Sequence, residues 1–138
     1  MSSARAYVAL GSNLGDRAAA LQLARQQIAG LPGTVVRGAS AIEETMPLRG
    51  LVQPAYLNQM IALDTTLAPK ELLAACHRIE AEAGRTRTAR WASRTLDIDI
   101  VSYGSIALDD PALVLPHPGL PDRDFWRREL DQLHRAGW

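Results

Sequence analysis

Cysteine, lysine and aromatic residues are scarce in this sequence, and each scarcity narrows the class of protein. The 138 residues include one cysteine, Cys76, which excludes an internal disulfide framework. Cys76 falls in an apolar helical pattern, so we expect it to pack in the core rather than react. Lys70 is the single lysine, and arginine therefore carries almost all of the basic charge.

Net charge and long apolar runs are missing as well. Fifteen basic and fifteen acidic side chains cancel, so no overall field draws the chain to nucleic acid or to a membrane. No run approaches the roughly 20 apolar residues of a membrane-spanning helix, and no signal-peptide pattern begins the chain. We expect a cytoplasmic protein without a membrane partner, folded as one domain over residues 1–138.

Hydrophobic periodicity and turn residues predict strands and helices along the chain. Asp16 suits the N-cap of the first helix, Gly30 and Pro32 end it, and Pro69 fits the first turn of the second helix. The predicted strands cover 6–10, 34–40 with an extension to 43, 56–65, 94–101 and a short segment near 106. The predicted helices cover 17–29, 69–83 and a short segment from 124, while 45–53 and 113–121 are predicted loops.

The order strand, helix, strand, strand, helix, strand predicts an α+β protein. It is the order of the ferredoxin-like βαββαβ core, in which both helices pack on one face of an antiparallel sheet. The short C-terminal helix would place Trp126, Leu130 and Leu133 on one face.

The segment Arg94-Thr95-Leu96-Asp97-Ile98-Asp99-Ile100-Val101 carries the most informative pattern. Apolar and polar residues alternate, so Asp97 and Asp99 emerge on one face of a strand, about 7 Å apart at Cα. Two carboxylates this close repel unless a cation lies between them, and Mg²⁺ is typically held by one or two carboxylates plus phosphates. The alternative is an exposed strand face with solvated acids.

A group of arginines precedes this strand and favours the metal hypothesis. Arg85, Arg87, Arg90 and Arg94 occur within ten residues that contain no acid. Guanidinium groups match phosphate oxygens and stay charged at working pH. A solvated loop would explain each arginine singly but explains the cluster poorly. The chain has no Walker-type loop, so phosphate binding would depend on arginine and metal.

Other residues are suited to a flat polar ligand. Loop 45–48 and Asn58 offer hydrogen-bonding groups, and an amide presents a donor and an acceptor side by side. Tyr56, Trp91 and Phe125 could stack against a ring. Backbone capping by Asn58 and core packing by Tyr56 are the alternatives.

His117 lies between two prolines, which stiffen its backbone. It could donate to a phosphate oxygen or move a proton, and a surface-loop role is the alternative. His77 and His134 fall in helical segments and are expected to be exposed. No Cys/His spacing indicates zinc.

Four segments together resemble a known family. They are Tyr7-Val8-Ala9-Leu10-Gly11-Ser12-Asn13-Leu14-Gly15-Asp16, Tyr56-Leu57-Asn58-Gln59, the run from Gly84-Arg85 to Asp99-Ile100, and Leu115-Pro116-His117-Pro118 with Arg123-Asp124-Phe125. In this order they resemble 6-hydroxymethyl-7,8-dihydropterin pyrophosphokinases over residues 5–126. The resemblance implies transfer of the β,γ-diphosphate of ATP to the pterin's hydroxymethyl oxygen, with release of AMP, in folate biosynthesis.

The same resemblance implies residue roles. Asp97 and Asp99 would hold two Mg²⁺ ions that bridge the triphosphate of ATP, and would be catalytic together with Arg85 and Arg94. The implied ATP-binding residues are Glu80, Arg85, Arg87, Arg94, His117 and Arg123. The implied pterin-binding residues are Thr45, Pro47, Leu48, Tyr56, Asn58, Trp91 and Phe125, with Gly11, Ser12 and Asn13 shaping the floor of the pocket.

The chain also departs from the family pattern. Met46 stands where the family usually has a second proline, and Thr88 stands where a basic residue often follows the Gly-Arg-x-Arg run. The segment after Phe125 is shorter than is usual in the family. These departures support a second hypothesis, a noncatalytic or substrate-altered paralogue that binds pterin or nucleotide. A nucleic-acid binder is disfavoured because aromatic residues make up 5% of the chain. We expect a monomer with small-molecule substrates.

Overall fold

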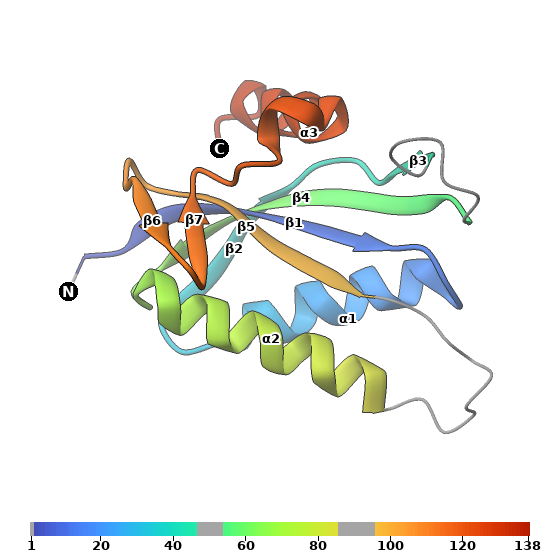
Figure 1. Cartoon of the computed structure of the whole chain (residues 1–138), viewed down its shortest axis with the longest axis horizontal. Helices are drawn as coiled ribbons and strands as arrows, with labels where there is room; N and C mark the ends of the chain where they lie inside the picture. The colour runs from blue at the N-terminus through green and yellow to red at the C-terminus, as the bar shows by residue number, and fades with distance from the viewer. Residues whose placement is uncertain (1, 47–53, 86–95) are drawn as a thin grey trace.

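The chain forms an antiparallel β-sheet with helices on both of its faces (Figure 1). The computed structural model describes residues 2–46, 54–85 and 96–138. The elements are β1 (Ala4–Ser12), α1 (Arg17–Ala29), β2 (Thr34–Ala39), β3 (Glu43–Thr45), β4 (Tyr56–Thr65), α2 (Pro69–Arg85), β5 (Asp97–Tyr103), β6 (Leu108–Asp110), β7 (Leu113–Leu115), the 3-10 turn η2 (Leu120–Asp122) and α3 (Asp124–Arg135). The predicted α+β class is therefore confirmed.

The main sheet has the strand order β2–β4–β1–β5, with β3 also paired to β4. Every pairing in it is antiparallel. Helices α1 and α2 cover one face, as predicted, and α3 covers the other (Figure 1). Strand β1 lies between β4 and β5, so Gly11 is opposite both Asn58 and Asp97. This register brings three distant segments together at one end of the sheet.

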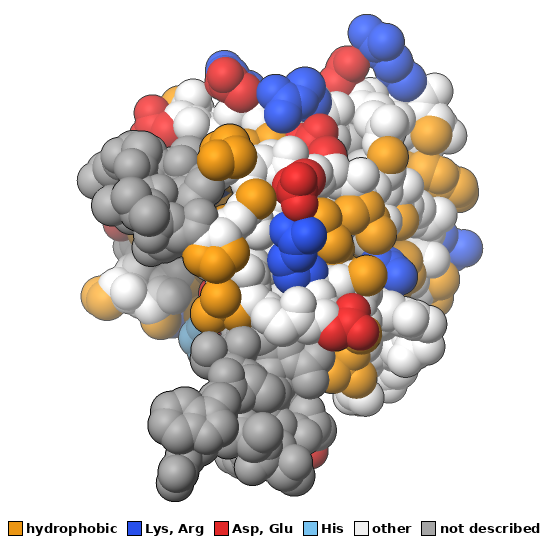
Figure 2. Space-filling model, turned by 90° about the vertical axis from the view of Figure 1, so that its right-hand side faces the viewer, with side chains coloured by type: hydrophobic (Ala, Val, Ile, Leu, Met, Phe, Trp, Pro, Cys, Tyr) orange, Lys and Arg blue, Asp and Glu red, His pale blue; other side chains and the backbone are white. Residues whose placement is uncertain are grey.

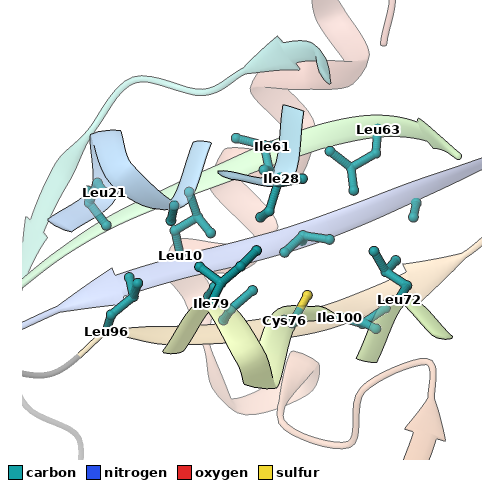
Figure 3. Packing of buried hydrophobic residues seen from close by; sticks show 14 of the residues in the cluster. Leu10, Leu21, Ile28, Ile61, Leu63, Leu72, Cys76, Ile79, Leu96 and Ile100 are labelled. Atoms are coloured by element: carbon teal, nitrogen blue, oxygen red, sulfur yellow. The ribbon is translucent and has the colours of Figure 1, made fainter. Parts of the chain in front are cut away.

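The core lies mainly between the sheet and the pair α1 and α2 (Figure 3). Alternation along β1 sends Val8 and Leu10 toward these helices, while Ala9 faces α3 with Trp126 and Leu133. Cys76 is fully buried in the larger cluster, and burial raises the pKa of its thiol to about 12. Its predicted role in packing is confirmed.

Local signals set the helix boundaries where the chain carries clear caps. The side chain of Asp16 accepts a hydrogen bond from the backbone N–H of Ala19 at 3.0 Å, and α1 covers the predicted residues. Helix α2 continues to Arg85, two residues beyond the prediction. On α3, Trp126 and Leu133 are buried and Leu130 packs beside them, as expected.

Several predicted strand boundaries and one predicted loop were wrong. Strand β1 is longer than 6–10 at both ends, and β5 continues beyond 101 to Tyr103. Strand β2 does not extend to 43, because the hydroxyl of Ser40 accepts from the N–H of Met60 and interrupts the ladder before β3. The short strand expected near 106 is β6, two residues later. Segment 113–121 begins with β7, which pairs with β6 in a hairpin closed by a hydrogen bond from Ala112 N to Asp110 Oδ1.

Glu129, on the buried side of α3, is an unexpected feature of this face. It is 3% exposed, and neither carboxyl oxygen has a hydrogen-bond partner within the described part of the chain. Burial, together with the nearby carboxylate of Glu43 on β3, raises the pKa of Glu129 to about 9. Arg128 pairs with Glu43 at 3.2 Å and opposes this effect only weakly.

We predict that Glu129→Gln stabilises the protein increasingly as pH rises. Because the folded-state pKa lies above the ordinary value, the folded state holds the proton more tightly, and the free energy of unfolding falls between pH ~4.5 and ~9. Glutamine does not ionise, so this loss is absent in the variant. Its free energy of unfolding should exceed that of the wild type by about 2 to 3 kcal/mol at pH 7. Denaturant unfolding from pH 5 to 9 measures it. Asp131→Asn, at an exposed position of α3, is the control, and an equal pH slope in wild type and Glu129→Gln would contradict the prediction.

Within the ranges that the structure describes, no helix is long and apolar enough to cross a bilayer.

Candidate active site

A cavity of about 340 Å³ opens where β1, β3, β4 and β5 meet the start of α3. Eight residues that the sequence analysis proposed lie in its wall: Gly11, Thr45, Tyr56, Asn58, Asp97, Asp99, Arg123 and Phe125. The remaining wall residues are Ala9, Leu10, Met46 and Trp126. We call this space the main cavity. Its wall combines two acids, one guanidinium, an amide and three aromatic rings.

The acids of the main cavity come from β5. Asp97 lies opposite Gly11 of β1, and Asp99 lies opposite Ala9 of β1. Both acids are therefore next to β1, which lies between β4 and β5 in the sheet. Enclosure of Asp97 by its surroundings, and then the negative charge of Asp99, raise the pKa of Asp97 above its ordinary value. The repulsion expected from the spacing is thus present, and a cation between the carboxylates would relieve it.

The amide of Asn58 is fixed at the opposite wall of the main cavity. Its Nδ2 donates to Thr45 Oγ1 at 2.5 Å, and the residue is 6% exposed. A Cβ at Gly11 would lie 3.3 Å from Asn58 Oδ1 and 3.6 Å from the ring of Tyr56, so glycine leaves space for both. Burial, followed by the charge of Asp97, raises the pKa of Tyr56. Tyr56 therefore stays a neutral phenol at working pH.

A second cavity, of about 290 Å³, lies between α2, β5 and the β6–β7 hairpin. Asp99 belongs to the walls of both cavities. Glu80 of α2 also lines the second cavity, and its Oε2 accepts from Ile98 N at 2.7 Å, which ties β5 to the helix. Burial, opposed by that hydrogen bond, raises the pKa of Glu80. The exposed His77 lies in this wall too, a role that its helical position alone did not indicate.

His117 lines the second cavity next to the acid that the two cavities share. Its Nε2 is 3.7 Å from Asp99 Oδ1, and its Nδ1 accepts from Gly119 N at 2.9 Å. An accepting Nδ1 places the proton of the neutral ring on Nε2, which faces the carboxylate. Burial, helped by Arg123 and opposed by Asp99, lowers the pKa of His117. The ring is therefore a neutral Nε2–H donor near pH 7.

Arg17, which the sequence analysis did not single out, joins the chain on both sides of segment 47–53. Its Nη1 donates to the carbonyl oxygen of Ala55 at 2.8 Å and lies 2.9 Å from Glu44 Oε2. Glu44 precedes the segment and Ala55 follows it. The first residue of α1 thereby fixes β3 beside β4 at the main cavity.

Several proposed residues lie outside the described part of the chain. They are Pro47, Leu48, Arg87, Trp91 and Arg94. Arg85 is the last residue of α2. Within the described residues no group of three or more His, Cys, Asp or Glu side chains could hold a metal ion, so the pair Asp97 and Asp99 remains a prediction.

Charges of both signs are interspersed on the face seen in Figure 2, which is the end of the molecule at the right of Figure 1. Among the described side chains drawn there, no extended area of a single sign is visible.

Comparisons with known proteins identify the family of the chain. A family model described as 7,8-dihydro-6-hydroxymethylpterin-pyrophosphokinase (HPPK) matches residues 7–135. The 2-amino-4-hydroxy-6-hydroxymethyldihydropteridine pyrophosphokinase of Methylorubrum extorquens is 44% identical over 121 residues, which are 88% of this chain and 77% of that protein. The protein of the same name from Pseudomonas putida is 44% identical over 113 residues, covering 82% and 93%. The folic acid synthesis protein fol1 of Schizosaccharomyces pombe is 37% identical over 125 residues, covering 91% and 17%.

Proposed function

The chain belongs to the 7,8-dihydro-6-hydroxymethylpterin-pyrophosphokinase family, and we propose on this basis that it transfers diphosphate from ATP to 6-hydroxymethyl-7,8-dihydropterin in folate biosynthesis. The observation that carries the proposal is the pair of cavities that share Asp99. One is lined by aromatic rings and an amide, the other by Glu80 and His117. A pterin and a nucleotide would therefore meet at the two acids of β5.

The reaction forms one bond and breaks one bond. The hydroxymethyl oxygen attacks the β-phosphorus of ATP, the bond from that phosphorus to the oxygen shared with the α-phosphorus breaks, and AMP leaves with this oxygen. The hydroxyl proton passes to water. Such a transfer depends chiefly on alignment and on neutralising phosphate charge, rather than on covalent help from the protein.

The main cavity suits the pterin. Asn58, held by Thr45, would hydrogen-bond the polar edge of the ring, and Tyr56 and Phe125 would lie along its faces. The pairing of Gly11 with Asn58 keeps the floor clear for a flat ligand. The resemblance adds Pro47, Leu48 and Trp91 to this set.

The second cavity suits the nucleotide. His117 would donate through Nε2–H to a phosphate oxygen, and Arg123, in the wall of the main cavity, would supply a permanent positive charge. Glu80 supports this end by fixing β5 to α2. Arg85, Arg87 and Arg94 complete the proposed set, with Arg85 and Arg94 bracing the transferring phosphates.

Asp97 and Asp99 form a donor set that fits Mg²⁺. Both supply hard oxygen ligands. Burial, followed by the charge of Asp99, raises the pKa of Asp97, and a bound cation would offset the repulsion between the two carboxylates. We propose two ions held by these carboxylates together with ATP. Mg²⁺ bound there would neutralise triphosphate charge.

We also propose that the core is ferredoxin-like and that the protein acts as a cytoplasmic monomer. The order β2–β4–β1–β5, with antiparallel pairs and with α1 and α2 on one face, supports the first statement.

An AMP-release assay tests the function. The protein is incubated with ATP, Mg²⁺ and 6-hydroxymethyl-7,8-dihydropterin, and we expect AMP and the pterin diphosphate in equal amounts. Tight binding of both ligands without AMP would instead indicate a noncatalytic paralogue. Omission of the pterin is the control, since AMP formed without it would come from hydrolysis of ATP.

A further inference from the structure

Arg123 is held by contacts on more than one side. Its guanidinium carbon lies 4.6 Å from the centre of the indole ring of Trp126, a distance at which the cation attracts the ring face. A Cβ at Gly119 would lie 1.5 Å from Arg123 Nη1, so the guanidinium occupies the space where that residue has no side chain. The side chain of Arg123 therefore needs both an indole and a glycine in these places.

His117 depends on the same two residues. Its ring meets the indole of Trp126 edge to face, with centres 4.9 Å apart and planes at 86°. Its Nδ1 accepts from the backbone N–H of Gly119. Trp126 is itself 3% exposed and packs with Ala9 and Met60 of the sheet, so it is a rigid support. Arg123 and His117, the two residues proposed to bind phosphate, therefore both contact Trp126 and Gly119.

We propose that Trp126 and Gly119 are positioning residues that hold Arg123 and His117 where the phosphates of ATP bind. The proposal rests on the ATP-dependent function described above. An arginine that is already fixed loses little conformational entropy when it binds phosphate. Less of its favourable interaction with the phosphate is therefore offset by ordering the side chain, both in the bound state and in the transition state. The sequence places a tryptophan in a helix and a glycine between two prolines, and only the fold shows that both contact Arg123.

Substitution at Gly119 tests the proposal without removing a core side chain. In Gly119→Ala the new methyl group displaces the end of the Arg123 side chain and lies 3.1 Å from His117 Nδ1, and neither group belongs to the core, so the fold is retained. Trp126→Leu removes the indole, and Trp126→Phe retains a ring face. We expect Gly119→Ala and Trp126→Leu each to lower kcat/KM for ATP by about tenfold or more, and Trp126→Phe to lower it by less than about threefold.

Double variants separate positioning from a general structural effect. In a background that carries both Arg123→Ala and His117→Ala, Gly119→Ala or Trp126→Leu should cost less than about twofold more, because both groups that they position are gone. Additive losses would overturn the proposal, as would near-normal activity of both single variants. Trp138→Leu removes the other indole beside an arginine, with Arg5 at 5.8 Å, and should change kcat/KM by less than about twofold.

A binding measurement keeps this test separate from the test of function. The dissociation constant for ATP is determined by calorimetry for the same variants, and it should show the same loss of additivity. A wild-type protein that binds ATP without forming AMP would overturn the proposed function, while the binding data would still decide the positioning roles. Additive effects on ATP binding would overturn the positioning roles even in an active enzyme.

Discussion

Asp97→Ala and Asp99→Ala should each abolish AMP release, with turnover reduced by about a thousandfold or more. Both acids belong to β5 and line the main cavity, and Asp99 also lines the second cavity. Removing either carboxylate leaves the triphosphate charge without the ion that it would hold, at the place where the pterin meets ATP. The measurement is AMP release at saturating concentrations of both substrates and Mg²⁺.

The stability of these variants distinguishes a chemical role from a structural one. The charge of Asp99 disfavours ionisation of Asp97, so removing one acid relieves repulsion and should not lower the free energy of unfolding. Asp109→Ala, at an exposed acid on β6, is the matched control and should retain turnover. Near-normal turnover in both β5 variants would contradict the metal hypothesis.

Local patterns were sufficient for the elements with strong periodicity and clear caps. Strand 56–65 and helix 17–29 were predicted at the observed boundaries because the apolar run of the strand and the Asp16 cap of the helix are local features of the sequence. The β6–β7 hairpin was partly missed, since three-residue strands carry too little periodicity to stand out from neighbouring prolines. Its turn depends on a single side chain, Asp110, bonding to the backbone two residues on.

The candidate site was predictable where spacing itself brings residues together. Asp97 and Asp99 needed only the two-residue period of a strand. Asn58 reaches the same cavity through the pairing of β1 with both β4 and β5, and no local pattern contains that register. Asn58 was proposed instead from the chemistry of its amide and from the family resemblance.

Supporting residues were missed for a related reason. Arg17 looked like an ordinary helix residue, and Trp126 was predicted only as part of a buried helix face. The contact of Arg17 with Ala55 spans 38 residues of sequence, so charge patterns cannot reveal it. Trp126 is only three residues from Arg123, but a hydrophobic pattern does not show that the guanidinium lies over the indole. Gly119 stood among loop residues, where a missing side chain gives no signal until its neighbours in space are known.

Asn58→Leu should raise KM for the pterin by about 30- to 100-fold and change KM for ATP by less than about twofold. The amide is 6% exposed, so leucine of similar volume preserves the packing but leaves the polar edge of the pterin without partners inside the cavity. Steady-state kinetics with each substrate varied in turn measures both constants. An equal rise in both KM values would show that Asn58 acts on the whole site rather than on the pterin.

Thr45 provides a graded version of the same experiment. Its hydroxyl accepts from Asn58 Nδ2 at 2.5 Å and so fixes which way the amide faces. Thr45→Val removes the acceptor and should raise KM for the pterin by about tenfold, whereas Thr45→Ser retains the hydroxyl and should stay within about threefold of wild type. In an Asn58→Leu background the valine substitution should add little, because the amide that the hydroxyl orients is gone. A further tenfold loss there would mean that Thr45 contacts the pterin independently of Asn58.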